Sequence, residues 1–390
     1  MRAFETLQRR FEPDLAGVHG ARVQVLFAAV FTLVRSGRLS LTSLGRAIAG
    51  KRTSPKHGIK RIDRLLGNTK LHVEQPVFYR AIARRLIAPG SKPVLLVDWT
   101  AVTPKLWALV AAVSFEGRAL IIYAETHPIS RYMKPFVNAA FLRQLQFVLP
   151  NGCVPVIVTD AGFRTPWMRL VASFGWDFVA RCRAPAKVRR DKGEAWYQVE
   201  DIWRYTRSVP SDLGYFEIGR KARYLCRFVG IRKRAAKMAR PLVRDCGSAR
   251  QLRNAREPWI LTTSLTCSAA KVVAIYRSRM QIEETFRDTK SNRFGLALGH
   301  ARTRSEARAN VLLLLAAFAH LVSMLLGLVG EAANLQLRFQ ANTVKNRRVI
   351  SLPTLGRLLA STCHDAVLNA ALAASAWAQL ALRVQAAVAS

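Results

Sequence analysis

The acidic residues come first, because this chain has few of them. Its 390 residues include 61 Lys and Arg against 24 Asp and Glu, yet three acids lie within IYRSRMQIEETFRDTK, residues 275–290. On a single ideal helix Glu283 borders the apolar stripe, whereas Glu284 and Asp288 lie on the far side, where solvent would surround them. The spacing therefore singles out Glu283 as the acid that can face other parts of the protein.

Cationic and aromatic residues accompany Glu283 on the same helix face. Tyr276, Arg279 and Lys290 fall with it inside an arc of about 60°. The simplest alternative is an exposed pair between Arg279 and Glu283 at i, i+4, which contributes only ~0.3–0.5 kcal/mol. Helix geometry alone does not decide between such a pair and a functional acid.

Two aspartates supply possible partners. Asp98 ends the apolar run KPVLLVDWT and Asp160 ends VPVIVTD. Both runs are typical of strands that are buried on both faces, and ligands bind at the carboxyl ends of such strands. The alternative for each residue alone is a turn or a helix cap. Two in one sheet region favour a shared site with Glu283.

Three converging carboxylates beside a surplus of cations suit one kind of chemistry. Hard Mg²⁺ or Mn²⁺ ions prefer oxygen ligands, and a pair of ions can activate the attacking oxygen and stabilise the leaving oxygen of a phosphodiester. Lys and Arg on the same face would hold the flanking phosphates. The sequence thus predicts two-metal phosphodiester cleavage, with Asp98, Asp160 and Glu283 as ligands.

The segments around these acids predict a mixed α/β core. Short apolar runs at 92–182 alternate with helical segments, including a hairpin through Glu116 and Gly117 and a helix at 134–148. Residues 184–256 are rich in Arg and Lys and contain strand-like pieces, which predicts a β-rich insertion. We divide the chain into a helical domain at 1–90, a catalytic domain at 91–335, and a basic loop and helical region at 336–390.

The N-terminal region contains a helix with one apolar and one cationic face. Ser54 and Pro55 are a favourable cap and first turn, and Gly67 is a favourable stop. The cationic face could contact DNA or only face solvent. We expect DNA contacts from Lys56, His57, Lys60, Arg61 and Arg64.

The charge of the whole chain points to a polyanionic partner. The formal net charge is +37, which attracts a phosphate backbone, with an anionic membrane as the alternative. Six cysteines without a C-x-x-C pair and seven scattered histidines exclude a zinc site of the usual spacing. Reduced thiols and the lack of a secretory signal predict a cytoplasmic protein.

One segment is apolar enough to cross a membrane. VLLLLAAFAHLVSMLLGLVG, residues 311–330, carries no formal charge. It contains His320 and Ser323 and is the only such run, so we favour a buried helix of a large core and expect no membrane span.

The residues at 276–290 also carry a resemblance. YRSRMQIEETFRDTK matches Y-x2-R-x3-E-x6-K, the hallmark of bacterial DDE transposases of the IS-four family. VLLVDWT and VTDAGFRTPW resemble the two aspartate motifs of that family. GIKRIDRLLGN and FQANTVKNR resemble the transposase of tetracycline-resistance transposon ten. The similarity covers about residues 20–355.

The resemblance implies a ribonuclease-H-like mixed sheet interrupted by the insertion. It implies that Asp98, Asp160 and Glu283 bind metal, and that Tyr276, Arg279 and Lys290 grip phosphates at the transposon end. Water would nick one strand, and the freed 3′-hydroxyl would attack the other strand to form a hairpin. A second water would reopen it before the 3′-hydroxyl joins target DNA.

The same resemblance implies further partners. Trp259 would stack on a base flipped out of the hairpin, unless it is simply a core residue at a strand start. The substrate would be double-stranded DNA, both the terminal inverted repeats and the target, bridged by a homodimer. Two other functions stay open: an inactive DNA-binding regulator derived from a transposase, and a structure-specific nuclease on the same fold.

Overall fold

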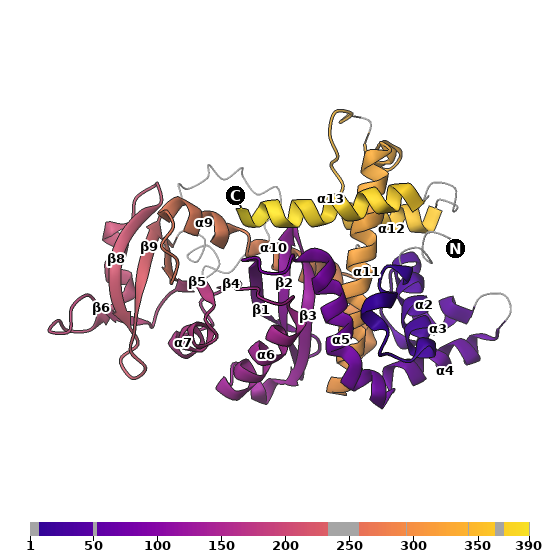
Figure 1. Ribbon diagram of the computed structural model, residues 1–390, viewed down its shortest axis with the longest axis horizontal. Helices are drawn as coiled ribbons and strands as arrows, with labels where there is room; N and C mark the ends of the chain where they lie inside the picture. The colour runs from indigo at the N-terminus through magenta and orange to yellow at the C-terminus, as the bar shows by residue number, and fades with distance from the viewer. Residues whose placement is uncertain are drawn as a thin grey trace, which may run out of the picture.

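The computed structural model describes residues 8–49, 53–232, 257–293, 295–341, 343–362 and 370–389. In these residues ten strands form one mixed sheet, in the order β3-β2-β1-β4-β5-β10-β9-β8-β6-β7. Helices lie along the sheet and gather at its β3 end (Figure 1). The mixed α/β architecture is consistent with the ribonuclease-H-like core that the resemblance implies.

The first five strands hold the centre of the sheet. They are β1 (Val94–Ala101), β2 (Leu106–Phe115), β3 (Arg118–Pro128), β4 (Val156–Thr159) and β5 (Asp177–Cys182). β2 pairs antiparallel with both β1 and β3, whereas β4 runs parallel to β1 and to β5. Most of their side chains are buried, because helices cover these strands. The parallel strands β1 and β4 therefore end at the same edge.

A tight turn joins β2 to β3, as the sequence predicts. Glu116 and Gly117 have positive φ angles of 44° and 80°. Two consecutive positive angles match the right-handed twist of a hairpin, and glycine adopts such an angle without steric cost.

Four helices pack close to the central strands. They are α6 (Pro135–Val148), α7 (Thr165–Ser173), α9 (Ala269–Arg277) and α10 (Met280–Lys290). α10 contacts β1, β2 and β3, while α6 contacts β3 and α7 contacts β5. In Figure 1, α6 and α7 lie below the strands, and α9 and α10 lie above them.

The predicted insertion extends the same sheet. It contributes β6 (Lys187–Arg189), β7 (Tyr197–Gln198), β8 (Ser211–Ile218) and β9 (Tyr224–Ile231). The next strand in the chain, β10 (Trp259–Thr263), pairs with β5 on one side and β9 on the other. β10 thus joins the central strands to those of the insertion. Residues 233–256 of the predicted insertion lie outside the described residues.

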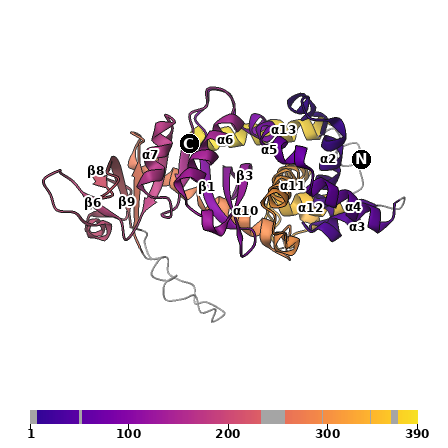
Figure 2. The same ribbon diagram turned by 90° about the horizontal axis from the view of Figure 1, so that it is seen from below.

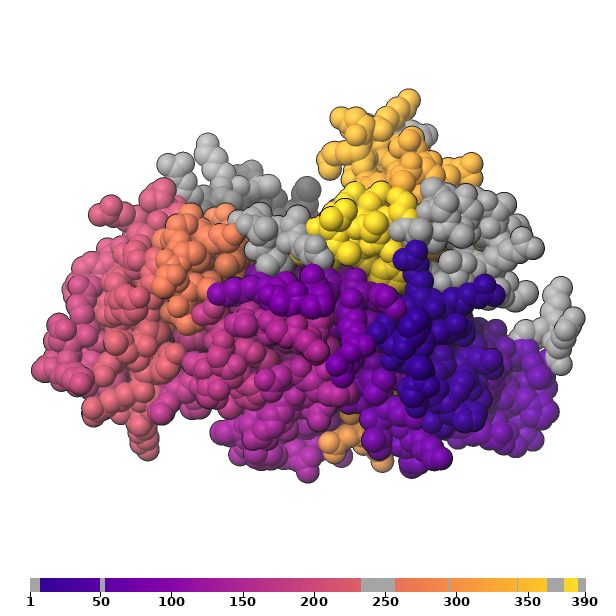
Figure 3. Space-filling model, in the orientation of Figure 1, coloured from indigo at the N-terminus to yellow at the C-terminus, as the bar shows by residue number. Residues whose placement is uncertain are grey.

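Helices from both ends of the chain surround α11 (Glu306–Ala332). The N-terminal helices are α2 (Gly20–Ser36), α3 (Leu41–Ala49), α4 (Pro55–Leu66) and α5 (Thr69–Leu86), and the C-terminal helices are α12 (Leu352–Thr362) and α13 (Ala370–Ala389). The ring of Phe318 on α11 packs edge-on against Phe11, Phe27 and Phe78. Seen from below, α11 passes between these helices (Figure 2), and Figure 3 shows α13, in yellow, lying across the surface.

The apolar segment at 311–330 is a core helix, as predicted. α11 is the one described helix that is long and apolar enough by itself to cross a membrane, and its most apolar window is 100% buried in the protein. Two glycines let α12 approach it, because a side-chain carbon at Gly327 or Gly356 would overlap the backbone of the other helix. Helix packing thus explains this composition.

Short 3₁₀ helices complete the described elements. They are η1 (Glu12–Leu15), η2 (Ile129–Arg131), η3 (Val199–Tyr205), η4 (Leu298–Ala301) and η5 (Leu335–Arg338).

Candidate active site

The sheet brings Asp98 and Asp160 to one edge. In the parallel pair of β1 and β4, Leu96 lies opposite Val158, so each aspartate is two residues beyond a matched position. Asp98 accepts a hydrogen bond from the backbone N–H of Trp99 at 2.8 Å, and Asp160 accepts one from Gly162 at 2.8 Å. Asp160 directly follows β4. The expectation that Asp98 also ends its strand is wrong, because β1 stays paired with β2 as far as Ala101 and Asp98 lies opposite Val110.

The helix that carries Glu283 is not continuous with the one that carries Tyr276. The prediction of a single helix over 275–290 is wrong, because α9 ends at Arg277 and α10 begins at Met280. At the break, Ser278 and Arg279 donate backbone bonds to Ile275 and Tyr276, three residues back. The Ser278 hydroxyl also donates to the Ile275 carbonyl at 2.7 Å. This tight turn leaves Arg279 between the two helices.

Arg279 connects two of the predicted acids. Its Nη2 lies 2.6 Å from Oε1 of Glu283, and its Nη1 lies 3.4 Å from Oδ2 of Asp98. The Arg279 side chain is only 11% exposed, against 42% for Glu283. The i, i+4 pair is therefore part of a half-buried cluster, in which one guanidinium serves carboxylates from β1 and α10.

The electrostatics of Asp98 show that all three carboxylates act on one another. The pKa of Asp98 is raised to about 7, first by burial and then by the charges of Asp160 and Glu283, while Arg279 and the hydrogen bond from Trp99 oppose the rise. Each of these carboxylates is thus close enough to disfavour the ionised form of Asp98. The structure brings the three predicted acids into one electrostatic neighbourhood.

Lys290 lies at the other end of α10. Its Nζ donates to Oγ1 of Thr100 at 2.6 Å, two residues after Asp98 on β1. Burial lowers the pKa of Lys290, and the charge of Asp98 opposes that shift. Lys290 therefore reaches the C-terminal part of β1, close to Asp98.

Tyr276 and Trp259 form a buried pair next to the acids. Their rings meet edge-on with centroids 4.9 Å apart, and the residues are 3% and 8% exposed. Burial raises the pKa of Tyr276, and the charge of Asp160 adds to that rise. Tyr276 thus lies near Asp160, and Trp259 is buried in this structure.

The two remaining acids of α10 have a structural role. Asp288 accepts a hydrogen bond from Nε of Arg118 at 2.6 Å, and Glu284 pairs with Arg287 at 2.8 Å. The expectation that both face solvent is wrong for Asp288, whose side chain is 14% exposed. This side of α10 packs on β3, so Arg118 at the start of β3 neutralises the acid.

Two residues near the acids were missed by sequence reasoning. Tyr132 packs edge-on against Trp99 and Trp107, with centroids 5.2 and 5.0 Å apart. Burial raises the pKa of Tyr132, and the charges of Asp160 and Asp98 raise it further. Arg181 on β5 is the second, because Tyr276 and Arg279 act on its pKa, which burial lowers. The sequence offered one hint of Tyr132: the aromatic residue Trp99, which directly follows Asp98 and against which Tyr132 packs.

The predicted DNA-contact residues of α4 lie away from this cluster. The helix has the predicted Ser54 cap and buries Ile62, Leu65 and Leu66. Figure 1 places α4 at the end of the molecule beyond α11, whereas β1 and β4 lie at its centre. Lys56, His57, Lys60, Arg61 and Arg64 are all exposed, and so are Pro55 and Asp63 of the same helix.

The carboxylates fit a divalent metal by donor type. Within the described part of the chain, no group of three or more His, Cys, Asp or Glu side chains is arranged as a metal site. Glu283 instead faces Arg279, which supplies positive charge at this position. Burial is the largest cause of the raised pKa of Asp98, and the charges of Asp160 and Glu283 add to it. A hard cation that binds carboxylate oxygens would relieve this repulsion between the acids.

Comparison with known proteins identifies the family of the chain. No curated protein matches the chain. A family model described as a transposase DDE domain matches residues 89–322, which is more than half of the chain. That match includes β1, β4 and α10, and with them Asp98, Asp160 and Glu283. The chain therefore belongs to the family of transposases with a DDE domain.

Proposed function

We propose that this protein cuts DNA at the two ends of a mobile element and joins the freed 3′ ends to target DNA. Asp98, Asp160 and Glu283 are the catalytic carboxylates. The observation that carries this proposal is the cluster itself, in which Arg279 joins Asp98 to Glu283 beside the strand end of Asp160. Family membership supports the transposase activity, and the cluster supports the assignment of residues.

The three carboxylates would hold Mg²⁺ or Mn²⁺, and two such ions would polarise the attacking oxygen and stabilise the leaving oxygen. Glu283 would turn from Arg279 to join the two aspartates. Its half-exposed side chain has the freedom to do so, whereas each aspartate is held by a hydrogen bond from a backbone N–H.

The cations of the site would position the DNA backbone. Arg279 presents a planar guanidinium that can bind a phosphate through two N–H groups once Glu283 leaves it. Lys290 brings a point charge to the edge of β1 beside Thr100. Holding the phosphates on both sides of the scissile bond keeps the reacting atoms in line, which accounts for a large part of catalysis.

We further propose that cleavage proceeds through a hairpin. A water oxygen attacks one phosphodiester, and the bond to the 3′ oxygen breaks to leave a 3′-hydroxyl. That hydroxyl attacks a phosphodiester of the opposite strand, which seals a hairpin on the end of the element and releases the flanking DNA with a 3′-hydroxyl of its own. A second water hydrolyses the hairpin phosphodiester and restores the 3′-hydroxyl of the element. This hydroxyl then attacks a phosphodiester of the target, and the broken target strand leaves with a 3′-hydroxyl. Trp259 would stack on the flipped base, which requires Tyr276 to move off its ring.

Double-stranded DNA would also bind outside the catalytic cluster. The exposed cationic face of α4 would contact the backbone of the terminal repeats. A homodimer would bridge two ends, so that both are cut in one complex. This assembly would work in the bacterial cytoplasm.

The test uses a DNA fragment that carries the terminal inverted repeats flanking this coding region. Incubation with Mg²⁺ should give nicked ends, hairpins and then joined products. Glu283→Gln should abolish cleavage and leave DNA binding intact, whereas Glu284→Gln, at the adjacent position, should retain cleavage. Full activity of Glu283→Gln would remove the assignment.

The same assay separates the other two functions. An inactive regulator would bind the repeats without cutting them. A structure-specific nuclease would cut branched DNA without preference for the repeats, and would form no joined product.

A further inference from the structure

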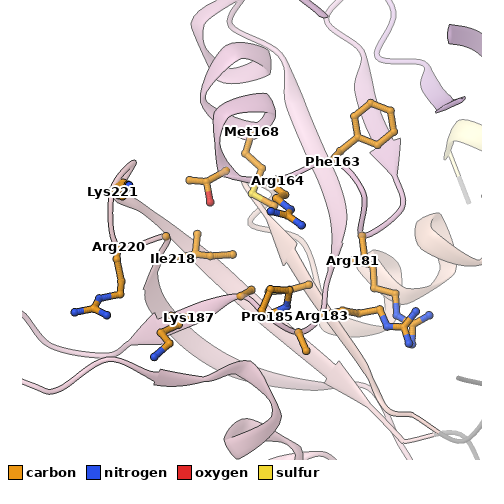
Figure 4. Close-up of a pocket in the computed structure, with 16 residues that line it drawn as sticks. Phe163, Arg164, Met168, Arg181, Arg183, Pro185, Lys187, Ile218, Arg220 and Lys221 are labelled. Carbon is orange, nitrogen blue, oxygen red and sulfur yellow. The ribbon is translucent and has the colours of Figure 1, made fainter. Parts of the chain in front are cut away.

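A cavity of about 480 Å³ lies where the central strands meet the insertion. We call it the insertion cavity, and Figure 4 shows the residues around it. One wall is the loop after Asp160 with the start of α7, and the opposite wall is the turn between β8 and β9. The end of β5 and the start of β6 form its base.

The lining of the cavity is strongly cationic. No Asp or Glu is among its described lining residues, which include six cations: Arg164, Arg181, Arg183, Lys187, Arg220 and Lys221. Glu257 pairs with Arg181 and with Arg183, at 3.4 and 2.6 Å. The other four cations have no ion-pair partner among the residues that the structure describes. Four charges are thus available to an anionic ligand.

Apolar side chains form part of the lining. Phe163, Met168 and Ile218 are almost completely buried, at 1–3% exposure. Figure 4 shows Ile218 and Met168 between the cations of the two sides. An apolar surface with cations around it suits a ligand with an apolar part and a phosphate, as a nucleotide unit has.

The wall on the insertion side is fixed to the catalytic domain. Gly219 has φ +82°, and a side-chain carbon there would lie 2.8 Å from Oγ1 of Thr165 on α7. Its backbone N–H donates to the carbonyl of Lys187 at 3.0 Å. Glycine therefore lets the β8–β9 turn meet α7, which sets Arg220 and Lys221 at the cavity.

The insertion cavity adjoins the candidate active site. Ala161, which lines the cavity, directly follows Asp160. Arg181 connects the two places. It lines the cavity, and it is close enough to Tyr276 and Arg279 for both to act on its pKa, which burial lowers, Tyr276 raises and Arg279 lowers. A DNA strand with one phosphate at Asp160 would thus have its next nucleotides at the cavity.

We propose that the insertion cavity binds a phosphodiester of single-stranded DNA that leaves the carboxylates, through Arg164, Lys187, Arg220 and Lys221. This inference rests on the proposed function, because the strand is placed by the carboxylates. A single strand fits the observations better than a duplex, since a cavity of this volume admits a nucleotide unit and no double helix. The insertion then contributes directly to DNA binding.

The test compares a short duplex that carries a single-stranded thymidine tail with the same duplex without a tail. Binding to the full chain is measured without divalent cations, across a range of salt concentrations. Arg220→Gln should weaken binding of the tailed DNA several-fold and reduce its salt slope by roughly 0.7, the value for one contact with a single strand. Binding of the blunt duplex should not change.

The control is Arg223→Gln, which removes the same charge from the same turn. Arg223 is exposed and does not line the cavity, so this variant should bind both duplexes as the wild type does. Equal effects of the two variants, or an equal loss for tailed and blunt DNA, would overturn the proposal.

A second measurement locates the contact. Single phosphates of the tail are replaced by neutral methylphosphonates. One position should weaken binding to the wild type but not to Arg220→Gln, because the two changes remove the same interaction. If no position of the tail shows this pattern, the assignment to Arg220 is wrong.

A last experiment tests whether the ligand of the cavity is a free nucleotide. If thymidine triphosphate binds through Arg220 while tailed DNA binds equally well to both proteins, the ligand is a free nucleotide and the strand assignment is wrong. Cleavage is measured separately, so the two proposals can fail independently. A wild type that binds tails through Arg220 but never cuts would contradict only the proposed function.

Discussion

The guanidinium of Arg279 lies between Asp98 and Glu283, with Nη1 3.4 Å from one carboxylate and Nη2 2.6 Å from the other. The residue is positioned by the turn between α9 and α10, not by a helix. Its charge opposes the rise in the pKa of Asp98 that burial and the other acids cause. Arg279 thus keeps mutually repelling carboxylates together.

Removal of this charge is expected to shift the pH dependence of DNA cleavage. Arg279→Gln takes away the cation that lowers the pKa of Asp98, so ionisation of Asp98 needs a higher pH. In a plot of cleavage rate against pH, the acidic limb should move to higher pH by roughly one pH unit, which is the low end of the usual effect of a close opposite charge. Arg287→Gln, which loses an exposed charge on α10, should leave the profile unchanged. An unshifted profile for Arg279→Gln would contradict this account.

Much of the site could be predicted because its parts are local. Apolar runs that end in an acid predicted β1 and β4, and two parallel strands place Asp98 and Asp160 at one edge. In the same way, the cap at Ser54 and the division into one apolar and one cationic face predicted α4. Each feature depends on residues within a few positions.

Features that depend on distant contacts could not be predicted. The assumption of a single ideal helix over 275–290 placed Ser278 inside that helix. The chain instead forms a tight turn there, although no Gly or Pro marks it. The same assumption also placed Asp288 in solvent, because Arg118 is 170 positions away and only the fold brings it there. The pairing of β10 with β9 joins residues 28 to 36 positions apart (259 − 231 and 263 − 227), and it makes the insertion part of one sheet.

The cationic face of α4 should supply salt-dependent DNA binding. Lys60→Gln, Arg61→Gln and Arg64→Gln each remove an exposed charge, and each should lower the salt slope of duplex binding by about 0.9 if it contacts a phosphate. Arg143→Gln on α6 removes an exposed charge far from α4 and should leave the slope unchanged. Equal slopes for all four variants would show that the face of α4 is only solvated.

Tyr132 should contact DNA beside the carboxylates. It is 41% exposed, and Trp99 and Trp107 support its ring edge-on. An aromatic ring so placed can stack on a base, which contributes about 1–3 kcal/mol. Tyr132→Ala should therefore weaken DNA binding by at least about fivefold, whereas Tyr132→Phe should bind as the wild type does. Equal affinity of the Ala and Phe variants would exclude stacking at this position.

A buried histidine should make the stability of the protein fall in mild acid. His320 on α11 lies 2.9 Å, by its Nε2, from Oγ1 of Thr289 on α10, and the Thr289 hydroxyl donates to the carbonyl of Thr285. The imidazole therefore donates from Nε2, and it holds the helix that carries Glu283 and Lys290. The pKa of His320 is lowered to about 4, mainly by burial and also by the charges of Arg357 and Arg118, while Asp288 opposes the shift.

The direction of the effect follows from proton binding. Histidine in an unfolded chain has a pKa of about 6.5, so below that pH the unfolded state binds a proton that the folded state excludes. The free energy of unfolding should then fall from about pH 6.5 to about pH 4, by roughly 3 kcal/mol in total from this group. His320→Gln keeps a donor but cannot titrate, so the stability difference between wild type and variant should change in sign or size across this window. Thr289→Val, which loses only the hydrogen bond, should keep the pH dependence of the wild type. A difference between wild type and His320→Gln that stays constant with pH would show that His320 has the same pKa in the folded and unfolded states, and the linkage would be wrong.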